Sequence, residues 1–267
     1  MPLWHLAILA LIQGITEFLP ISSSAHLVLT PVVLGTPDQG LLFDIAVHFG
    51  SLIAVCVYFW RETLKLPVGA IHLLGKKRQS TEAKLTLLVL IASIPIIVAG
   101  FFLHSLVPAG FRSMEMIAIA TIVFGLLLGL ADWIGAKRKS MGQMDRFDAL
   151  LIGLAQVLAL IPGTSRSGIT MTMARLIGYT RPEAARFALL LSIPAIGGAT
   201  ALGVYDVWQA GAWRFGTDLA IAALLSALAA FAAIAVMMRW LEKASFTPFV
   251  IYRLLLGAVL LAYVYLH

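Results

Sequence analysis

The sequence contains little charge. Asp, Glu, Lys and Arg make up only 12% of its 267 residues, while 61% are hydrophobic and the mean hydropathy is +0.97. Soluble domains carry about a quarter charged residues, so this composition could not cover a water-facing surface and excludes a soluble globular protein. The hydrophobic residues form long runs, which are typical of membrane-spanning helices.

Cysteine is also nearly absent. The single Cys56, inside an apolar run, excludes a disulfide framework and a cysteine metal cluster. The N-terminus lacks a basic segment and a small-residue cleavage site, so we expect no cleavable signal peptide. No linker rich in Pro, Ser or Gly divides the chain, and we therefore expect one integral membrane domain over residues 1–267.

Six hydrophobic runs are long enough, at about 20 residues, to cross a bilayer core of ~30 Å. They cover residues 41–60, 85–106, 114–134, 184–205, 217–238 and 248–266. Two further apolar regions, 3–34 and 147–178, are interrupted by proline and clustered serines. Their pieces are mostly too short to span, which favours re-entrant hairpins whose irregular backbone is buried in protein or faces a wet cavity.

The two halves of the chain, about 1–135 and 145–267, resemble each other. Each half has one broken hairpin followed by three spans, and three spans per half would insert the second half upside down. The echoed positions are Gln13, Pro20 and Ser23 in the first half, and Gln156, Pro162 and Ser165 in the second. The predicted fold is therefore an all-α polytopic membrane protein of two inverted-topology repeats, as in transporters with broken helices.

The basic residues support this topology. Loops 61–84 and 135–146 hold six and four Lys or Arg residues, whereas loops 107–113 and 206–216 hold one each. By the positive-inside rule, the basic loops lie in the cytoplasm and both termini lie outside. The net charge of +6 therefore needs no nucleic-acid partner, and the two hairpin tips should meet near the midplane.

The first hairpin carries ionisable residues at membrane depth, where they are costly and usually functional. Gln13 and Glu17 lie four residues apart and share one helix face. Ser23 and His26 share a face if a helix begins at the serines, which favour N-cap positions. A helix N-terminus offers free N–H groups and partial positive charge, which suit a phosphate.

The second hairpin carries a similar cluster around Arg166. The guanidinium group supplies a fixed charge and a planar fork that matches phosphate oxygens. Ser165, Ser167 and Thr170 offer hydroxyl groups at a second helix start, and Gly163 allows a close approach of the backbone to a ligand. For Thr170, as for Ser22 in the first hairpin, a bond within its own helix is an equal alternative.

Other polar residues leave alternatives open. Asp44 and His48 either line the same cavity or pair with each other, and Arg253 either acts as a counter-ion or faces the interior acid Asp132. Four histidines lie near ends or loops and three acids sit at helix starts, where neither group needs a function. These are His5, His72, His104, His267, Asp145, Asp148 and Glu183.

The two motifs resemble a known family. Residues 13–26 resemble the Glu/Gln-x-x-x-Glu motif, with Pro-x-Ser-Ser and His, of the undecaprenyl pyrophosphate phosphatases, also called the bacitracin resistance family. Residues 162–170 resemble its Pro-Gly-x-Ser-Arg-Ser-x-x-Thr motif at every fixed position. The resemblance covers essentially the whole chain, including residues 59–61 and 248–253. Gln13 departs from the Glu of many members and removes one carboxylate from the site.

The resemblance implies hydrolysis of a C55 polyprenyl pyrophosphate to the monophosphate and inorganic phosphate. That reaction recycles the lipid carrier of bacterial cell-wall precursors and confers bacitracin tolerance. The implied location is the bacterial cytoplasmic (inner) membrane, and the topology predicted from the loop charges favours a site that opens to the outer side. The partners are then the lipid substrate and membrane lipids, and a homodimer is an open question.

For such a site we expect Arg166 to stabilise the transition state and Glu17, helped by Gln13, to bind a divalent cation, Mg²⁺ or Ca²⁺. Ser23 is the candidate nucleophile with His26 as general base, or His26 activates water while Ser23 only binds phosphate. The expected phosphate-binding residues are Gln13, Ser22, Ser24, Gly163, Ser165, Ser167 and Thr170.

Two other functions compete with hydrolysis. Inverted repeats with helix breaks at the midplane are transporter architecture, so the chain could carry a lipid phosphate or another anion across the bilayer. A structural scaffold fits poorly, because it has no need of Glu17, His26 and Arg166 in the membrane. The sequence lacks the motif series of the lipid phosphatases that use a phosphohistidine.

Overall fold

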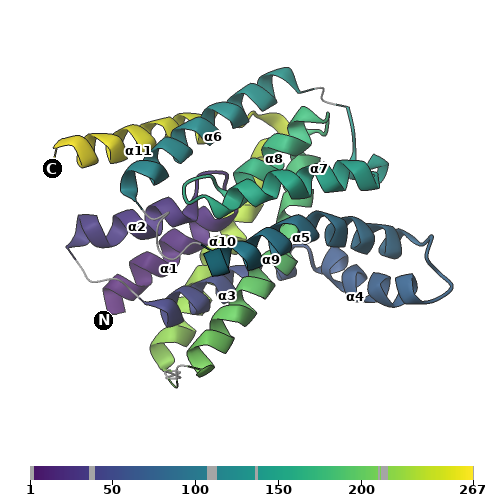
Figure 1. Cartoon of the computed structure of the whole chain (residues 1–267), viewed down its shortest axis with the longest axis horizontal. Coiled ribbons are helices and arrows are strands. Elements are labelled where there is room, and N and C mark those ends of the chain that lie inside the picture. The colour runs from purple at the N-terminus through teal and green to yellow at the C-terminus, as the bar shows by residue number, and fades with distance from the viewer. Residues whose placement is uncertain are drawn as a thin grey trace.

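The computed structural model describes residues 3–35, 40–106, 113–135, 138–209, 211 and 216–266. The described residues are overwhelmingly helical, as the composition predicted (Figure 1). The α-helices are α1 (Leu3–Phe18), α2 (Ser23–Leu34), α3 (Leu41–Tyr58), α4 (Trp60–Leu74), α5 (Thr81–Leu106), α6 (Met114–Ile134), α7 (Arg146–Val157), α8 (Arg166–Leu176), α9 (Arg181–Gln209), α10 (Thr217–Lys243) and α11 (Thr247–Leu266). Two 3₁₀ turns, η1 (Met141–Gln143) and η2 (Leu158–Leu160), flank α7.

Six helices of the described chain are long and apolar enough to cross a membrane. They are the predicted spans: α3, α5, α6, α9, α10 and α11. Each has mean hydropathy of at least 1.9 over its most apolar stretch, and many large hydrophobic side chains on them face outward. That is the expected surface of a helix bundle bathed in lipid. The protein is therefore a multi-pass membrane protein.

Both interrupted regions break where proline and serine predicted. α1 ends before Pro20 and α2 begins at Ser23, while α7 and η2 end before Pro162 and α8 begins at Arg166. Proline disfavours helical backbone at the preceding residue. At each break one serine adopts a left-handed backbone, Ser22 with φ 73° and Ser165 with φ 68°. Such strain in non-glycine residues persists where surrounding contacts enforce it, and it often accompanies function.

The stretch after the first full span differs from the prediction. Residues 61–84 were expected to form a basic loop, but most of them belong to α4 and the start of α5. α4 packs against α5 at Gly69, where an added Cβ would lie 2.1 Å from the Thr86 hydroxyl oxygen. The same hydroxyl donates a hydrogen bond to the carbonyl of Leu66. The high charge of this stretch led to the prediction of a loop, although most of the stretch forms an amphipathic helix.

Helices from the two halves pack in pairs (Figure 1). α6 lies beside α11, α3 beside α9, α1 beside α10, and α7 beside α5. The ends of the chain lie at one end of the molecule, and the α4–α5 and α6–α7 connections lie at the other. The α4–α5 connection and the described part of the α6–α7 connection therefore lie away from the termini, which is the relative arrangement that the charge pattern predicted. The inverted orientation of the halves remains a prediction.

Candidate active site

Glu17, on the last turn of α1, is the centre of the polar cluster. Its Oε1 lies 2.6 Å from Arg166 Nη2 at the start of α8. Its Oε2 accepts hydrogen bonds from Ser23 Oγ and Gln13 Nε2, each at 2.8 Å, and lies 3.7 Å from His48 Nε2. The carboxylate is nearly inaccessible to solvent, so its charge is balanced by Arg166 rather than by water.

A polar cavity of about 160 Å³ lies beside this carboxylate. Three of the four residues expected to be catalytic line it, together with three of the serines expected to bind phosphate. The lining residues are Glu17, Ser22, Ser23, Ser24, His48, Ala159, Ser165 and Arg166. The two breaks, 139 or more positions apart in sequence, thus form one pocket. Its hydroxyl groups and single guanidinium suit an anionic, oxygen-rich group.

Arg253 of α11 holds the two breaks together. Its Nη1 donates to the carbonyl of Pro20 at 3.3 Å, its Nη2 to Gly163 at 3.0 Å and its Nε to Thr121 at 3.0 Å. The side chain is fully buried. Broken helices leave carbonyl groups without intrahelical partners, and Arg253 satisfies one at each break. One alternative from the sequence had Arg253 facing Asp132, and these contacts contradict it.

Ser165 caps the second half-helix. Its Oγ accepts a hydrogen bond from the amide of Gly168 at 3.1 Å, as expected of an N-cap serine. Gly168 has a second role, because an added Cβ would lie 2.8 Å from Arg253 Nη1. Gly163 has φ 94° and packs on α6, where an added Cβ would lie 2.3 Å from the Ile117 carbonyl oxygen. Packing and the turn therefore explain Gly163, rather than approach to a ligand.

His26 does not face Ser23. Its Nδ1 lies 2.7 Å from the carbonyl of Ser22, which can only accept, so Nδ1 carries the proton. Its Nε2 then accepts from the Tyr252 hydroxyl at 2.5 Å, and the two rings stack 3° from parallel. The Ser23 hydroxyl donates to Glu17 instead. The expected serine–histidine pair is replaced here by a serine–glutamate pair.

Several other predicted residues support the cavity without lining it. Ser167 Oγ donates to the Glu17 carbonyl at 3.2 Å, and Thr170 Oγ1 lies 2.9 Å from the Arg166 carbonyl within its own helix. Both are buried, so for Thr170 the alternative of a bond within the helix holds. Gln13 is also buried and holds Glu17 in place through its amide nitrogen. These three residues position the backbone and the carboxylate.

Asp132 belongs to a separate polar cluster. Its Oδ1 pairs with Arg175 at 3.1 Å and with Arg181 at 2.7 Å, and its Oδ2 accepts from the amide of Phe246. Three acids outside the site bond to helix starts or neighbouring loops. Asp145 caps α7, Asp148 lies in the first turn of α7, and Glu183 accepts from the amide of Met141.

Two residues of the site were missed or undervalued. His48 lines the cavity, and its Nδ1 lies 2.7 Å from the Asp44 carbonyl. The other ring nitrogen, Nε2, faces the Glu17 carboxylate. The alternative that placed His48 in the cavity is therefore confirmed. Tyr252 was read only as part of the family motif, and its contact with His26 joins residues 226 positions apart. No local sequence signal could predict that contact.

The donor set gives limited support for a divalent cation. Among the described residues, no three His, Cys, Asp or Glu side chains gather as a metal site. Gln13 Oε1, however, is buried without a hydrogen-bond partner in the part of the chain that the structure describes. Mg²⁺ typically takes one or two carboxylates and completes its shell with substrate phosphates. Glu17 and Gln13 fit a cation of that kind.

Comparison with known proteins agrees with these motifs. The model of the family described as "Bacitracin resistance protein BacA" matches residues 6–259. The chain belongs to this family. It is 47% identical over 266 residues to an undecaprenyl-diphosphatase of Roseobacter denitrificans, covering 99% of this chain and 100% of that protein. It is 48% identical to an undecaprenyl-diphosphatase of Alcanivorax borkumensis, covering 95% of this chain and 96% of that protein. It is also 48% identical to an undecaprenyl-diphosphatase of Hahella chejuensis, covering 98% of each protein.

The match to the BacA family extends over both halves of the candidate site. Both sequence motifs lie inside the matched region. The fold brings the two motifs into contact through Glu17 and Arg166. The likeness to the three relatives extends over nearly the whole chain, so it includes α11 with Tyr252 and Arg253 as well as the motifs.

Proposed function

We propose that this member of the BacA family is an undecaprenyl-diphosphatase, which hydrolyses undecaprenyl (C55) pyrophosphate to undecaprenyl phosphate and inorganic phosphate. The carrying observation is the convergence of Glu17, Ser23 and Arg166 from two broken hairpins on one polar cavity. The printed names of the relatives give the same activity for those proteins. The reaction recycles the cell-wall lipid carrier and gives bacitracin tolerance.

Arg166 and the start of α8 bind the terminal phosphate. Arg166 places Nη2 on Glu17, and its Nη1 has only a long contact, 3.5 Å, to the Ser192 carbonyl. A phosphate in the cavity can therefore recruit the guanidinium fork at little cost. The serine hydroxyls and the helix N-terminus add donors that stabilise charge as it moves onto the phosphoryl oxygens. Phosphoryl transfer depends mainly on such positioning and electrostatics.

Ser23 is the nucleophile and Glu17 takes its proton. The Ser23 oxygen forms a bond to the terminal phosphorus while the bond from phosphorus to the bridging oxygen breaks, and undecaprenyl phosphate leaves with that electron pair. Water then attacks the phosphoserine, Ser23 regains a proton, and inorganic phosphate departs. The 2.8 Å bond from Ser23 Oγ to Glu17 Oε2 favours this route over a His26 base. For His26 to serve, its Nε2 must first leave Tyr252.

Glu17 and the free Oε1 of Gln13 would hold a divalent cation, Mg²⁺ or Ca²⁺, together with substrate phosphates. When bound, the cation would neutralise charge on the pyrophosphate. The chain's own residues orient the carboxylate through Gln13 and Arg166.

We further propose one integral domain of two inverted repeats in the bacterial inner membrane, with its site open to the outer side. In the proposed repeats, α7 corresponds to α1 and α5 corresponds to α10. The packing follows this correspondence, because α1 packs on α10 and α7 packs on α5. The basic connections at the end opposite the termini support the orientation. A homodimer remains an open question that the size-exclusion profile of the purified protein addresses.

Transport of a lipid phosphate is the second candidate, favoured by the broken helices that meet in the bundle. One experiment separates the two functions. Purified protein in detergent, without any gradient, is given undecaprenyl pyrophosphate with and without a chelator, and phosphate and undecaprenyl phosphate are measured. We expect equal amounts of both products, loss of activity with the chelator and recovery with Mg²⁺ or Ca²⁺. Absence of phosphate release by folded protein would favour the transporter.

A further inference from the structure

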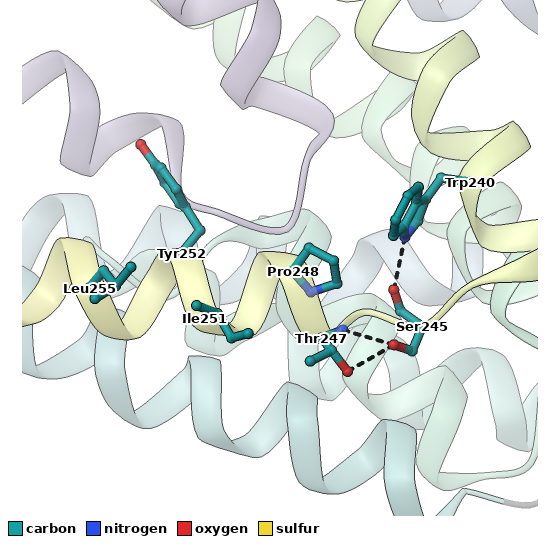
Figure 2. A pocket seen from close by; sticks show the side chains of 7 residues that line it. All are labelled: Trp240, Ser245, Thr247, Pro248, Ile251, Tyr252 and Leu255. Carbon is teal, nitrogen blue, oxygen red and sulfur yellow. Dashed lines mark hydrogen bonds between the residues drawn. The ribbon is translucent and has the colours of Figure 1, made fainter.

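An apolar groove of about 510 Å³ runs along the outer face of α11 from the end of α10. Figure 2 shows the residues that line it, with the Tyr252 ring pointing away from α11 toward the break between α1 and α2. The lining is almost entirely apolar or aromatic, and its polar members lie together at one end. The lining residues are Trp240, Ser245, Thr247, Pro248, Ile251, Tyr252 and Leu255.

Tyr252 connects this groove to the active site. One face of its side chain lines the groove, while its hydroxyl donates to His26 and the two rings stack. His26 in turn holds the carbonyl of Ser22, which lines the phosphate cavity. The groove and the cavity therefore lie on opposite sides of two packed side chains. A molecule with an anionic head in the cavity and an apolar chain beside Tyr252 would occupy both.

The lipid substrate requires such an exit for its chain. The cavity, at about 160 Å³, is too small for more than a headgroup. The chain must therefore leave toward lipid, next to the serines and His26. The groove has the apolar lining that such a chain needs, and Tyr252 and His26 connect it to the serines of the cavity. Its polar groups are already engaged, because Ser245 accepts from Trp240 and pairs with Thr247.

We propose, on the basis of the function proposed above, that this groove binds the isoprenoid chain of the substrate. The units nearest the pyrophosphate lie against Tyr252, and later units pass over Ile251 and Leu255. The flat, branched isoprene units suit the aromatic faces at Tyr252 and Trp240. The groove makes the enzyme selective for polyprenyl pyrophosphates over short pyrophosphates, because the chain contributes binding energy that a short substrate lacks.

The test compares chain lengths in a variant that fills the groove. Ile251→Trp narrows the groove, and Leu90→Trp, at an exposed position of α5 outside the groove, is the matched control. Phosphate release is measured in detergent with pyrophosphates of C55, C15 and C5 chains. For Ile251→Trp we expect kcat/KM to fall about tenfold or more for C55 and C15, mainly through KM, with C5 within about twofold of wild type. Leu90→Trp should match wild type.

An unchanged ratio of long-chain to short-chain kcat/KM in Ile251→Trp would overturn the proposal, and so would an equal loss in Leu90→Trp. Such results would mean that the groove holds an ordinary phospholipid chain or nothing specific. If wild type releases no phosphate from any of the substrates, the proposed function fails instead, which is a different result.

A second measurement does not depend on turnover of the C5 compound. A photoreactive amino acid at Leu255 should crosslink to C55 pyrophosphate, and excess unlabelled substrate should compete. The same group at the exposed Leu90 of α5, outside the groove, should give no competed product. Competed crosslinks at both positions, or at neither, would also contradict the proposal.

Discussion

At the scale of single residues, the site depends on a glutamate that faces two partners of different kinds. Glu17 Oε1 contacts the permanently charged guanidinium of Arg166, and Oε2 accepts a hydrogen bond from the Ser23 hydroxyl. Arg166 holds the carboxylate through Nη2, while its Nη1 has only a long contact to the Ser192 carbonyl. Arg166 can therefore bind substrate phosphate through Nη1 while Glu17 stays in place to take the Ser23 proton.

Ser23→Ala tests the nucleophile. We expect kcat to fall by about 10³-fold or more, because no other hydroxyl among the described residues bonds to the Glu17 carboxylate. Ser93→Ala is the control, since Ser93 is buried in α5 and donates only to its own helix. It should keep near-normal kcat. A loss below about tenfold for Ser23→Ala would favour water as the nucleophile.

Tyr252→Phe removes one hydroxyl and keeps the ring that stacks on His26. If His26 must leave Tyr252 to act on substrate, this variant should retain or raise kcat. If the bond positions His26, kcat should fall about tenfold with little change in KM. The structure favours the second outcome, because both ring nitrogens are already engaged. Tyr265→Phe, whose hydroxyl pairs with the distant Glu115, serves as the control.

The sequence was informative about single residues for a simple reason. Glu17 and Arg166 are ionisable groups in apolar runs, and their cost in a membrane predicted function without any contact information. Tyr252 is an ordinary residue for a membrane helix, so only its contact with His26 reveals its place. The expected contact between His26 and Ser23 is absent, because helical spacing from Ser23 does not fix where the His26 ring points.

At the scale of the elements, the two breaks are the functional parts. Proline and serine are local signals, so the sequence predicted both breaks within a few residues. It did not predict that Arg253, from a third element, joins them through their carbonyl groups. It also missed α4, because charge in a stretch of sequence indicates exposure and does not exclude a helix.

Arg253→Lys tests the joint between the breaks. A lysine cannot reach all three carbonyls, and each buried acceptor without a donor costs about 1–3 kcal/mol. We expect the free energy of unfolding to fall by about 2–6 kcal/mol for two such groups, with a parallel loss of kcat. Arg239→Lys, an exposed arginine of α10, should change neither. If chemical denaturation gives Arg253→Lys the same free energy of unfolding as wild type, Arg253 does not join the two breaks in this way.

Ser165 combines a cap with a strained backbone, and two variants separate these effects. Ser165→Ala loses the bond to the Gly168 amide and keeps φ 68° on a side-chain-bearing residue. Ser165→Gly loses the bond but relieves the strain. We expect the free energy of unfolding to be highest for wild type, lower for Ser165→Gly and lowest for Ser165→Ala. The difference between wild type and Ser165→Ala should be about 1 kcal/mol or more. Ala equal to Ser in thermal unfolding would mean that the cap contributes little.

At the scale of the whole molecule, charge determines orientation. The predicted spans follow from hydropathy and length alone, and all six are present among the described helices. The pairing of α1 with α10 and of α7 with α5 could not be read from the sequence, because apolar helix faces are interchangeable in composition. Loop 107–113, used in the charge argument, lies almost wholly outside the described residues.

Cysteine labelling tests the orientation. In a Cys56→Ala background, Lys77→Cys lies in the α4–α5 connection and Thr217→Cys at the start of α10. An impermeant maleimide should label Thr217→Cys in intact spheroplasts and Lys77→Cys only after permeabilisation. The reverse pattern would place the termini and the cavity's outer opening on the cytoplasmic side.

The most direct measurement is phosphate release from undecaprenyl pyrophosphate by Glu17→Ala, Arg166→Ala and the double variant, each shown to fold by its thermal unfolding profile. If the two side chains act on one headgroup, each single change should lower kcat/KM by several orders of magnitude, and the double variant should be little worse than either. Near-normal hydrolysis by either folded single variant would contradict the account.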